Sequence, residues 1–357
     1  MKFMKALLFL LALLPLPAFA GAESAALPEA QPGASRPAEN SAMPPETPAE
    51  KSEALPEKGG AAREGGMTVF DGAILGVVEG FTEFLPISST GHLIVANEML
   101  GLNSDAPAVY SNGEAISAGG KSYTVKDAAC AYTIIIQIAA IIAVVFVYWN
   151  DVASMLLGFL GRDRMGLLKL RNLIVAFVPA AVSGLLLHKV IETRLFSTGA
   201  VVFALVAGAF AMFWAQKKYS KEFCAARRAV QLHELSIKDS FIVGLFQCLA
   251  LWPGTSRSMA TIVGAYVVGL RPVEAAKFSF LLGLITLSAA SVFTLCKDGG
   301  NMFAALPLAP LAAGFVVAFI CSLLSAKWLV GFLNRRGLAP FAWYRILLAA
   351  VLCAFFI

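Results

Sequence analysis

Six apolar stretches, each about the length that crosses a lipid bilayer, constrain this chain more than any other feature. They lie near residues 130–149, 173–190, 199–216, 275–296, 306–330 and 340–357. A helix needs about 20 apolar residues to cross a hydrocarbon core of about 30 Å, and it satisfies its own backbone hydrogen bonds in lipid. We therefore predict an all-α polytopic membrane protein with six transmembrane helices.

The composition excludes several other classes. Of 357 residues, 58% are hydrophobic and only 14% are charged, whereas soluble domains average about 25% charged residues. These values exclude a soluble enzyme. The formal net charge of +5 is small and scattered, so it does not indicate a nucleic-acid-binding protein. The six cysteines have no spacing typical of a zinc site, a haem site or a disulfide framework. We interpret the cysteines as small apolar filling residues.

The N-terminal 66 residues lie outside this apolar core and divide into two segments. Residues 1–20 combine two lysines, an apolar run and a small-x-small ending, which together are typical of a secretory signal peptide. An uncleaved anchor is the alternative. Residues 21–66 are rich in Pro, Ala and Glu and lack aromatic residues, so we predict a disordered acidic tether. The membrane domain is then predicted to cover 67–357.

An internal repeat with an offset of 168 residues organises the membrane domain. Residues 71–102 align without a gap on residues 239–270, and Ser88 is matched with Ser256. Each copy reads as a helix, a polar break containing a proline and a second helix. At about 1.5 Å per residue, such a segment is too short to cross the bilayer twice. We therefore predict two re-entrant helical hairpins.

Small residues recur at every fourth position of the first helix in both copies. They are Gly72, Gly76 and Gly80 in the first copy and Ser240, Gly244 and Cys248 in the second. This spacing predicts close backbone contact with a neighbouring helix in lipid.

The charge of the connecting segments predicts the orientation of the hairpins. Most loop lysines and arginines fall in 150–172, 217–238 and 331–344, which the positive-inside rule assigns to the cytoplasm. Three crossings then separate the hairpins, so the first enters from the periplasm and the second from the cytoplasm. This is an inverted-topology repeat whose breaks should meet near the middle of the membrane. The polar insert 103–126 could form a small periplasmic hairpin.

Two acidic residues precede the first break. Glu79 and Glu83 are four residues apart, which places both carboxylates on one helix face. Acids inside a bilayer indicate a divalent cation, a basic partner such as Arg257, or a water-filled cavity. The plainer alternative is a wet membrane surface with loop cations nearby. The second copy has Gln247 and Leu251 at these positions, so the repeated fold does not itself require acids.

Hydroxyl groups and an imidazole follow the acids. These residues are Ser88, Ser89, Thr90 and His92. Individually they could be helix caps or packing residues, but beside two acids they indicate nucleophilic and proton-transfer chemistry.

The second break has the composition of an anion site. It consists of Gly254, Thr255, Ser256, Arg257 and Ser258. Hydroxyls, backbone N–H groups at a helix start and a guanidinium suit a phosphate group. The membrane setting predicts that the other end of the ligand is apolar.

The segments EGFTEFLPISSTGH (79–92) and PGTSRSMAT (253–261) resemble the two signature motifs of the bacterial undecaprenyl-diphosphatase family associated with bacitracin resistance. The resemblance extends from about residue 67 to the C-terminus. It implies hydrolysis of undecaprenyl diphosphate to undecaprenyl phosphate and phosphate, which recycles the lipid carrier for peptidoglycan synthesis, and it implies a need for Mg²⁺ or Ca²⁺. The active-site positions that it implies are Glu79, Glu83, Ser88, Ser89, Thr90, His92, Ser256 and Arg257.

On this basis we predict metal-assisted phosphoryl transfer. Glu79 and Glu83 would hold the cation, Ser89 would attack the terminal phosphorus and His92 would handle protons. Arg257 with Ser256 would neutralise the oxygens that gain charge, and the rest of the second break would bind substrate. Ser88, Thr90 and a metal-bound water stay open as alternative nucleophiles.

Location, assembly and a competing function complete the predictions. We expect the bacterial inner membrane, with the active site open to the periplasm, and a homodimer is a possible assembly. A polyprenyl-phosphate transporter or flippase is the alternative function, because carriers also use inverted repeats with broken helices.

Overall fold

The computed structural model describes residues 67–108, 117–118, 121–195, 197–219, 230–305 and 308–356. The predicted signal peptide and acidic tether lie outside these residues, as does the side chain of Thr90. Within the described ranges the architecture is helical, apart from one antiparallel pair of two-residue strands, β1 (Ser117–Ala118) and β2 (Lys121–Ser122). These strands lie in the polar insert 103–126, for which the sequence suggests a small hairpin.

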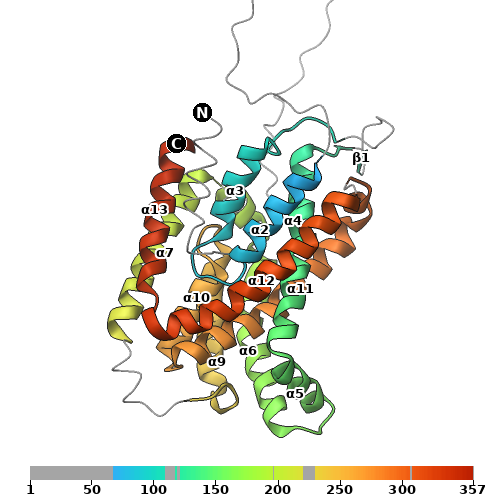
Figure 1. The fold of residues 1–357 in the computed structure, drawn as a ribbon. Helices are drawn as coiled ribbons and strands as arrows, with labels where there is room; N and C mark the ends of the chain where they lie inside the picture. The colour runs from blue at the N-terminus through green and yellow to red at the C-terminus, as the bar shows by residue number, and fades with distance from the viewer. Residues whose placement is uncertain are drawn as a thin grey trace, which may run out of the picture.

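The helices are labelled in chain order in Figure 1. They are α2 (Val69–Thr82), α3 (Ser89–Leu100), α4 (Val125–Val147), α5 (Trp149–Phe159), α6 (Arg164–Arg194), α7 (Thr198–Lys218), α9 (Ile237–Cys248), α10 (Arg257–Val267), α11 (Pro272–Ala305), α12 (Leu308–Arg336) and α13 (Ala339–Phe356). Two 3-10 turns, η1 (Leu232–Glu234) and η2 (Leu249–Leu251), flank α9.

Five described helices are long and apolar enough to cross a membrane. Their apolar parts are Val125–Val147, Arg164–Leu187, Thr198–Lys218, Pro272–Cys296 and Leu308–Arg336. The chain is therefore a multi-pass helical membrane protein. The sixth predicted span coincides with α13, whose apolar part, Ala339–Ala354, is shorter than the other five.

One predicted connecting segment has more regular structure than expected. Residues 150–172 form most of α5 and the first turns of α6 rather than a loop. Helix α5 buries Val152 and Met155 against the core and exposes Leu156 and Phe159. Charged residues set the membrane orientation of such a segment, but its short amphipathic pattern also stabilises a helix.

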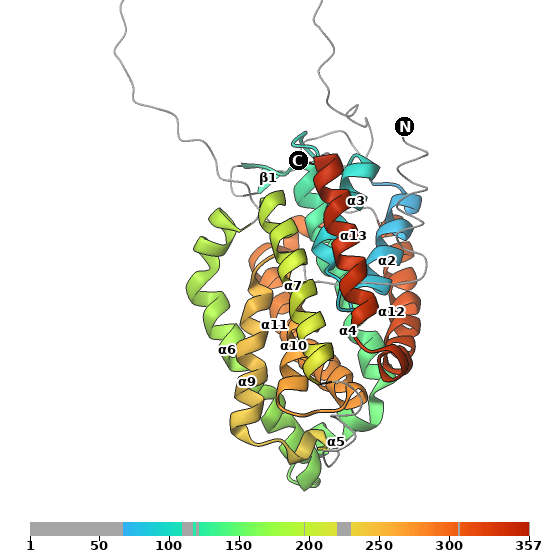
Figure 2. The ribbon, with the colours of Figure 1, turned by 90° about the vertical axis from the view of Figure 1, so that its left-hand side faces the viewer.

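The two repeat copies begin with the same local structure. Thr68 caps α2 in a capping box with Asp71, and Ser236 caps α9 in a capping box with Asp239. These pairs are again 168 residues apart. Helix α2 begins at the end of the molecule that carries the β-hairpin, whereas α9 begins at the opposite end, near α5 (Figures 1 and 2).

The predicted stripe of small residues packs against another helix. A Cβ added at Gly72, Gly76 or Gly80 would lie 2.5 Å from the carbonyl oxygen of Pro310, Gly314 or Ala318, respectively, all on α12. In the second copy, a Cβ at Gly244 would lie 2.5 Å from the carbonyl oxygen of Ala176 on α6. Each first helix is therefore fixed by direct backbone contact with a long helix, as the spacing predicts.

An ion-pair cluster joins α5, α6 and α11 at the end of the molecule opposite the β-hairpin. Asp151 accepts from Lys169 at 2.8 Å and from Lys277 at 2.7 Å. Partial burial raises the pKa of Asp151, but the hydrogen bonds and charges of the two lysines outweigh this effect and hold the pKa below its ordinary value. The carboxylate form is therefore the form that stabilises this corner.

Replacing Asp151 with asparagine should lower the melting temperature of the detergent-purified protein by several degrees at pH 7, because charge-assisted hydrogen bonds contribute about 1.5–3 kcal/mol each. Because folding lowers this pKa, the stabilisation is complete above about pH 4 and is lost as the pH falls through the folded value. The difference between wild type and variant should therefore shrink on acidification. The exposed Asp105→Asn is the control, and an equal effect there would contradict the assignment.

Candidate active site

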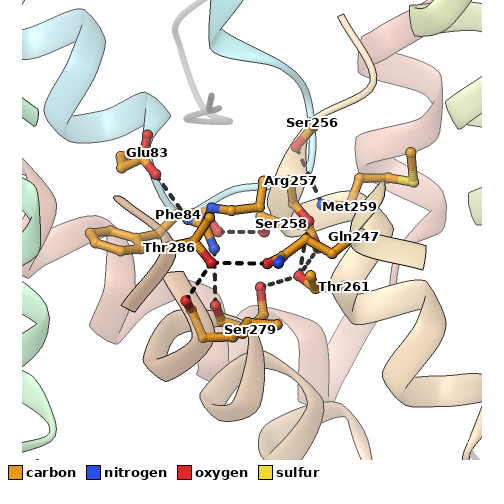
Figure 3. Close-up of polar contacts among 11 residues, drawn as sticks. Glu83, Phe84, Gln247, Ser256, Arg257, Ser258, Met259, Thr261, Ser279 and Thr286 are labelled. Atoms are coloured by element: carbon orange, nitrogen blue, oxygen red, sulfur yellow. Dashed lines mark hydrogen bonds and ion pairs between the residues drawn. The ribbon is translucent and has the colours of Figure 1, made fainter. Parts of the chain in front are cut away.

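The two breaks, far apart in sequence, meet in the structure. Arg257 Nη2 donates to Glu83 Oε1 at 2.9 Å, and both side chains are buried. Ser258 Oγ donates to the carbonyl oxygen of Phe84 at 3.1 Å, which ties the second break to the first (Figure 3). An acid from one copy and a guanidinium from the other therefore share one compartment.

Three of the four carboxylate oxygens on the acidic side of this compartment have no hydrogen-bond partner among the described residues. Glu79 and Glu83 occupy the last turn and the C-cap of α2, where the Glu83 N–H donates to the Glu79 carbonyl. Among the described residues, both carboxylate oxygens of Glu79 and Oε2 of Glu83 are buried without a hydrogen-bond partner. Burying a carboxylate in this way is costly. These oxygens therefore indicate a ligand that the chain itself does not supply.

The same strained backbone occurs in both breaks. Ser88 has φ 70° and ψ 112°, and Ser256 has φ 72° and ψ 117°. They are the two non-glycine residues with positive φ in the described ranges, and such conformations cost about 1–3 kcal/mol each. The strain thus recurs at the matched positions where α3 and α10 begin.

The hydroxyls of these two serines differ in their contacts. Ser256 Oγ accepts from the backbone N–H of Met259 at 3.3 Å and so caps α10. Ser88 Oγ is buried and has no hydrogen-bond partner in the described part of the chain. Ser89 is also buried, at the first position of α3. At these matched positions, the Ser88 hydroxyl has no partner among the described residues, whereas the Ser256 hydroxyl serves as a helix cap.

Both ring nitrogens of His92 are occupied. Nδ1 lies 2.8 Å from the carbonyl oxygen of Ser88, which can only accept, so Nδ1 carries a proton. Nε2 lies 2.6 Å from Tyr344 Oη, and the two rings stack with 5.6 Å between centroids. In the neutral imidazole, Nε2 therefore accepts from Tyr344.

The guanidinium of Arg257 is oriented by α11 as well as by Glu83. Arg257 Nη1 donates to the Ser279 carbonyl at 3.0 Å, and Ser279 Oγ lies 2.6 Å from Thr261 Oγ1 (Figure 3). Gly283 leaves space for the guanidinium, since a Cβ there would collide with it. Arg257 Nε has no hydrogen-bond partner among the described residues.

The other predicted residues of the second break have structural contacts. The carbonyl oxygens of Gly254 and Thr255 both accept from Arg345 on α13. The Ser258 hydroxyl is occupied by Phe84. Sequence reasoning missed Tyr344 and Arg345. An arginine within an apolar stretch is the signal that could have pointed to Arg345.

The donor set fits a hard divalent cation that is shared with a substrate. In the part of the chain that the structure describes, no three His, Cys, Asp or Glu side chains group to hold a metal. The protein offers two neighbouring carboxylates, three of whose oxygens are free of partners. Mg²⁺ is commonly bound by one or two carboxylates together with substrate phosphate oxygens and water.

Comparisons with known proteins show the family of this chain. The family model described as "Bacitracin resistance protein BacA" matches residues 72–351. The undecaprenyl-diphosphatase of Clostridium novyi is 39% identical over 283 residues, covering 78% of this chain and 92% of the relative. The undecaprenyl-diphosphatase of a Polaromonas species is 39% identical over 286 residues, covering 79% and 93%. The chain belongs to the bacitracin resistance protein BacA family.

Proposed function

We propose that this chain is a membrane phosphatase that converts undecaprenyl diphosphate to undecaprenyl phosphate and phosphate, and so recycles the lipid carrier for peptidoglycan synthesis. Relatives named undecaprenyl-diphosphatase align over most of the chain. The observation that carries the proposal is the buried contact of Glu83 with Arg257, beside carboxylate oxygens that lack hydrogen-bond partners among the described residues. Such a compartment suits a diphosphate together with a cation.

The reaction divides between the two breaks. A serine hydroxyl of the first break attacks the terminal phosphorus, and the bond from that phosphorus to the bridging oxygen breaks. Undecaprenyl phosphate leaves with the electron pair of that bond and takes up the serine proton. Water then releases phosphate from the serine. Ser89 is the nucleophile predicted from the sequence, and Ser88 is a second candidate because its hydroxyl has no partner among the described residues.

Arg257 stabilises the charge that develops on the phosphoryl oxygens. Its contacts with Glu83 and Ser279 fix the guanidinium before substrate arrives. His92 has a positioning role in this arrangement, because its Nδ1–H contacts the Ser88 carbonyl and its Nε2 accepts from Tyr344. Direct proton transfer from a serine to His92 would require Tyr344 to move away.

Glu79 and Glu83 are proposed to hold Mg²⁺ or Ca²⁺. When bound, such a cation would neutralise charge on the diphosphate. The three carboxylate oxygens without a partner in the part of the chain that the structure describes support this assignment, and oxygen ligands are the ones that both cations prefer.

We place the protein in the bacterial inner membrane with six crossings, two re-entrant hairpins and a site that opens to the periplasm. The short first helices, 14 residues in α2 and 12 in α9, support hairpins that do not cross, because a full crossing takes about 20 residues. The protein could act as a monomer or as a homodimer. Chemical cross-linking in membranes would distinguish these two oligomeric states.

Phosphate release by the purified full chain is the test of this function. With undecaprenyl diphosphate and Mg²⁺, the wild-type protein should release inorganic phosphate, and EDTA should stop the release. A transporter would move the lipid without releasing phosphate. Absence of release by protein that elutes as a single folded species would contradict the proposal.

A further inference from the structure

We propose that Tyr344 and Arg345, consecutive residues of α13, are positioning residues that together hold both breaks in their working geometry. The inference rests on the proposed function, since it assigns these residues to the same phosphatase site. Neither residue lies in the two signature segments.

Arg345 is fully buried and donates to four backbone carbonyl oxygens. Nε donates to the Leu205 carbonyl oxygen at 3.0 Å and Nη2 donates to the Ala204 carbonyl oxygen at 2.9 Å, both on α7. Nη1 contacts Thr255 at 2.9 Å, and Nη2 also contacts Gly254 at 3.0 Å. The guanidinium has five N–H donors in a fixed planar arrangement, and this geometry uses it to fasten the second break to α7.

The guanidinium of Arg345 has no ion-pair partner among the described residues. In this it differs from the buried Arg257, which is paired with Glu83. A cation in an apolar span costs at least about 2.5–3.5 kcal/mol. Helix α7 also makes room for it, because a Cβ at Gly208 would collide with the guanidinium. A fold that needed only packing at this point would be served better by an apolar side chain, so the arginine indicates a task.

Arg345 donates to the carbonyls of the two residues that come immediately before Ser256 and Arg257. Gly254 has φ 94°, and Ser256 two residues later has φ 72°. Arg257 follows and starts α10. Fixing residues 254 and 255 therefore fixes the strained serine and the point from which the Arg257 side chain extends toward Glu83.

Tyr344 reaches the other break. Its Oη lies 2.6 Å from His92 Nε2, and His92 Nδ1 lies 2.8 Å from the Ser88 carbonyl oxygen. Ser88 is the strained serine of the first break. Consecutive residues on a helix point about 100° apart, which lets one pair of side chains contact two different elements. One dipeptide of α13 is thus connected to both strained serines.

This arrangement predicts an effect on turnover rather than on substrate binding. Errors of about 1 Å in the placement of reacting groups can cost about 100-fold in rate. Neither Tyr344 nor Arg345 is assigned a contact with the substrate. Loss of either should therefore lower kcat and leave KM nearly unchanged.

Tyr344→Phe is the mildest test, because it removes only the hydroxyl that contacts His92. We expect kcat for phosphate release to fall about tenfold or more, with KM within about threefold. Tyr132→Phe is the matched control: it also removes a buried hydroxyl, whose bond at 2.8 Å goes to the Pro310 carbonyl, away from both breaks. Its kcat should stay at the wild-type level.

Gly208→Ala and Arg345→Lys test the other half of the pair. Gly208→Ala leaves both positioning residues in place but displaces the guanidinium, and it should lower kcat by about 10–100-fold. Arg345→Lys keeps the charge without the planar set of donors and should lose at least as much. Gly184→Ala is the control, because a Cβ there makes only an ordinary contact with Leu251 at 3.5 Å.

Thermal melting and size-exclusion profiles accompany each assay, so that kinetic effects are read only on folded protein. Wild-type kcat in folded Tyr344→Phe and Gly208→Ala would overturn the inference, as would equal losses in the two controls. If Arg345→Lys does not fold, the other two variants still decide. A wild-type protein that releases no phosphate would instead overturn the proposed function.

Discussion

Arg257→Lys should lower kcat for phosphate release by about 10²–10³-fold although the positive charge is kept. Lysine can still approach Glu83, but it cannot also donate to the Ser279 carbonyl in the fixed geometry of the guanidinium. The developing charge on the phosphoryl oxygens would then meet a mobile point charge. Arg271→Lys, at an exposed position just before α11, is the matched control and should behave as wild type.

The stability of a companion pair of variants tests whether Arg257 and Glu83 act together. Arg257→Gln leaves the Glu83 carboxylate buried without its partner, and breaking a buried pair in this way costs about 3–5 kcal/mol. Adding Glu83→Gln should restore much of the melting temperature but none of the activity. Additive destabilisation in the double variant would mean that the two side chains do not share one environment.

Glu79→Gln should abolish activity and at the same time stabilise the protein in EDTA. Both Glu79 oxygens are buried without partners among the described residues, so the charge destabilises the fold unless a cation is bound. Removal of that charge relieves the penalty. Stability and activity then change in opposite directions, which is expected where a site is built for a ligand rather than for the fold.

Melting temperatures with Mg²⁺ and with EDTA provide the readout. Mg²⁺ should raise the melting temperature of the wild type by mass action and should leave that of Glu79→Gln unchanged. Asp71→Asn is the control, because Asp71 is a buried acid on the same helix that serves a capping box. It should keep both the Mg²⁺ response and the activity. A full Mg²⁺ response in Glu79→Gln would contradict the metal assignment.

The sequence predicted those parts of the fold that follow from local pattern. The spacing of Gly72, Gly76 and Gly80 predicted the contact that α2 makes with α12. The polar breaks predicted where α3 and α10 begin, and the offset of the repeat paired Ser88 with Ser256 before their common backbone strain was known. These features depend on residues close together in sequence or on comparison of one copy with the other.

Contacts made by elements outside the repeat could not be predicted in this way. Tyr344 and Arg345 reach His92 and the second break across 252 and about 90 residues. No periodicity links α13 to either break. The helical state of α5 was also missed, because its charged flanks were interpreted only as an orientation signal and its burial depends on tertiary packing.

The repeat also explains how a symmetric fold carries asymmetric chemistry. The offset that matches the two strained serines matches Ser89 with Arg257 and Glu79 with Gln247. Equivalent backbone positions thus supply a hydroxyl on one side and a guanidinium on the other, an acid on one side and an amide on the other. Gln247 contacts Thr286 at 3.2 Å (Figure 3) and forms part of the packing of α11.

The central claim is that the two breaks share one diphosphate and one cation. A structure of the full chain with methylenediphosphonate and Mn²⁺, in which anomalous scattering locates the metal, tests it most directly. We predict a metal peak about 2–2.5 Å from carboxylate oxygens of Glu79 and Glu83, with the diphosphonate in contact with Arg257. A metal peak distant from both acids, or a diphosphonate bound at the lysines around Asp151 instead, would contradict the account.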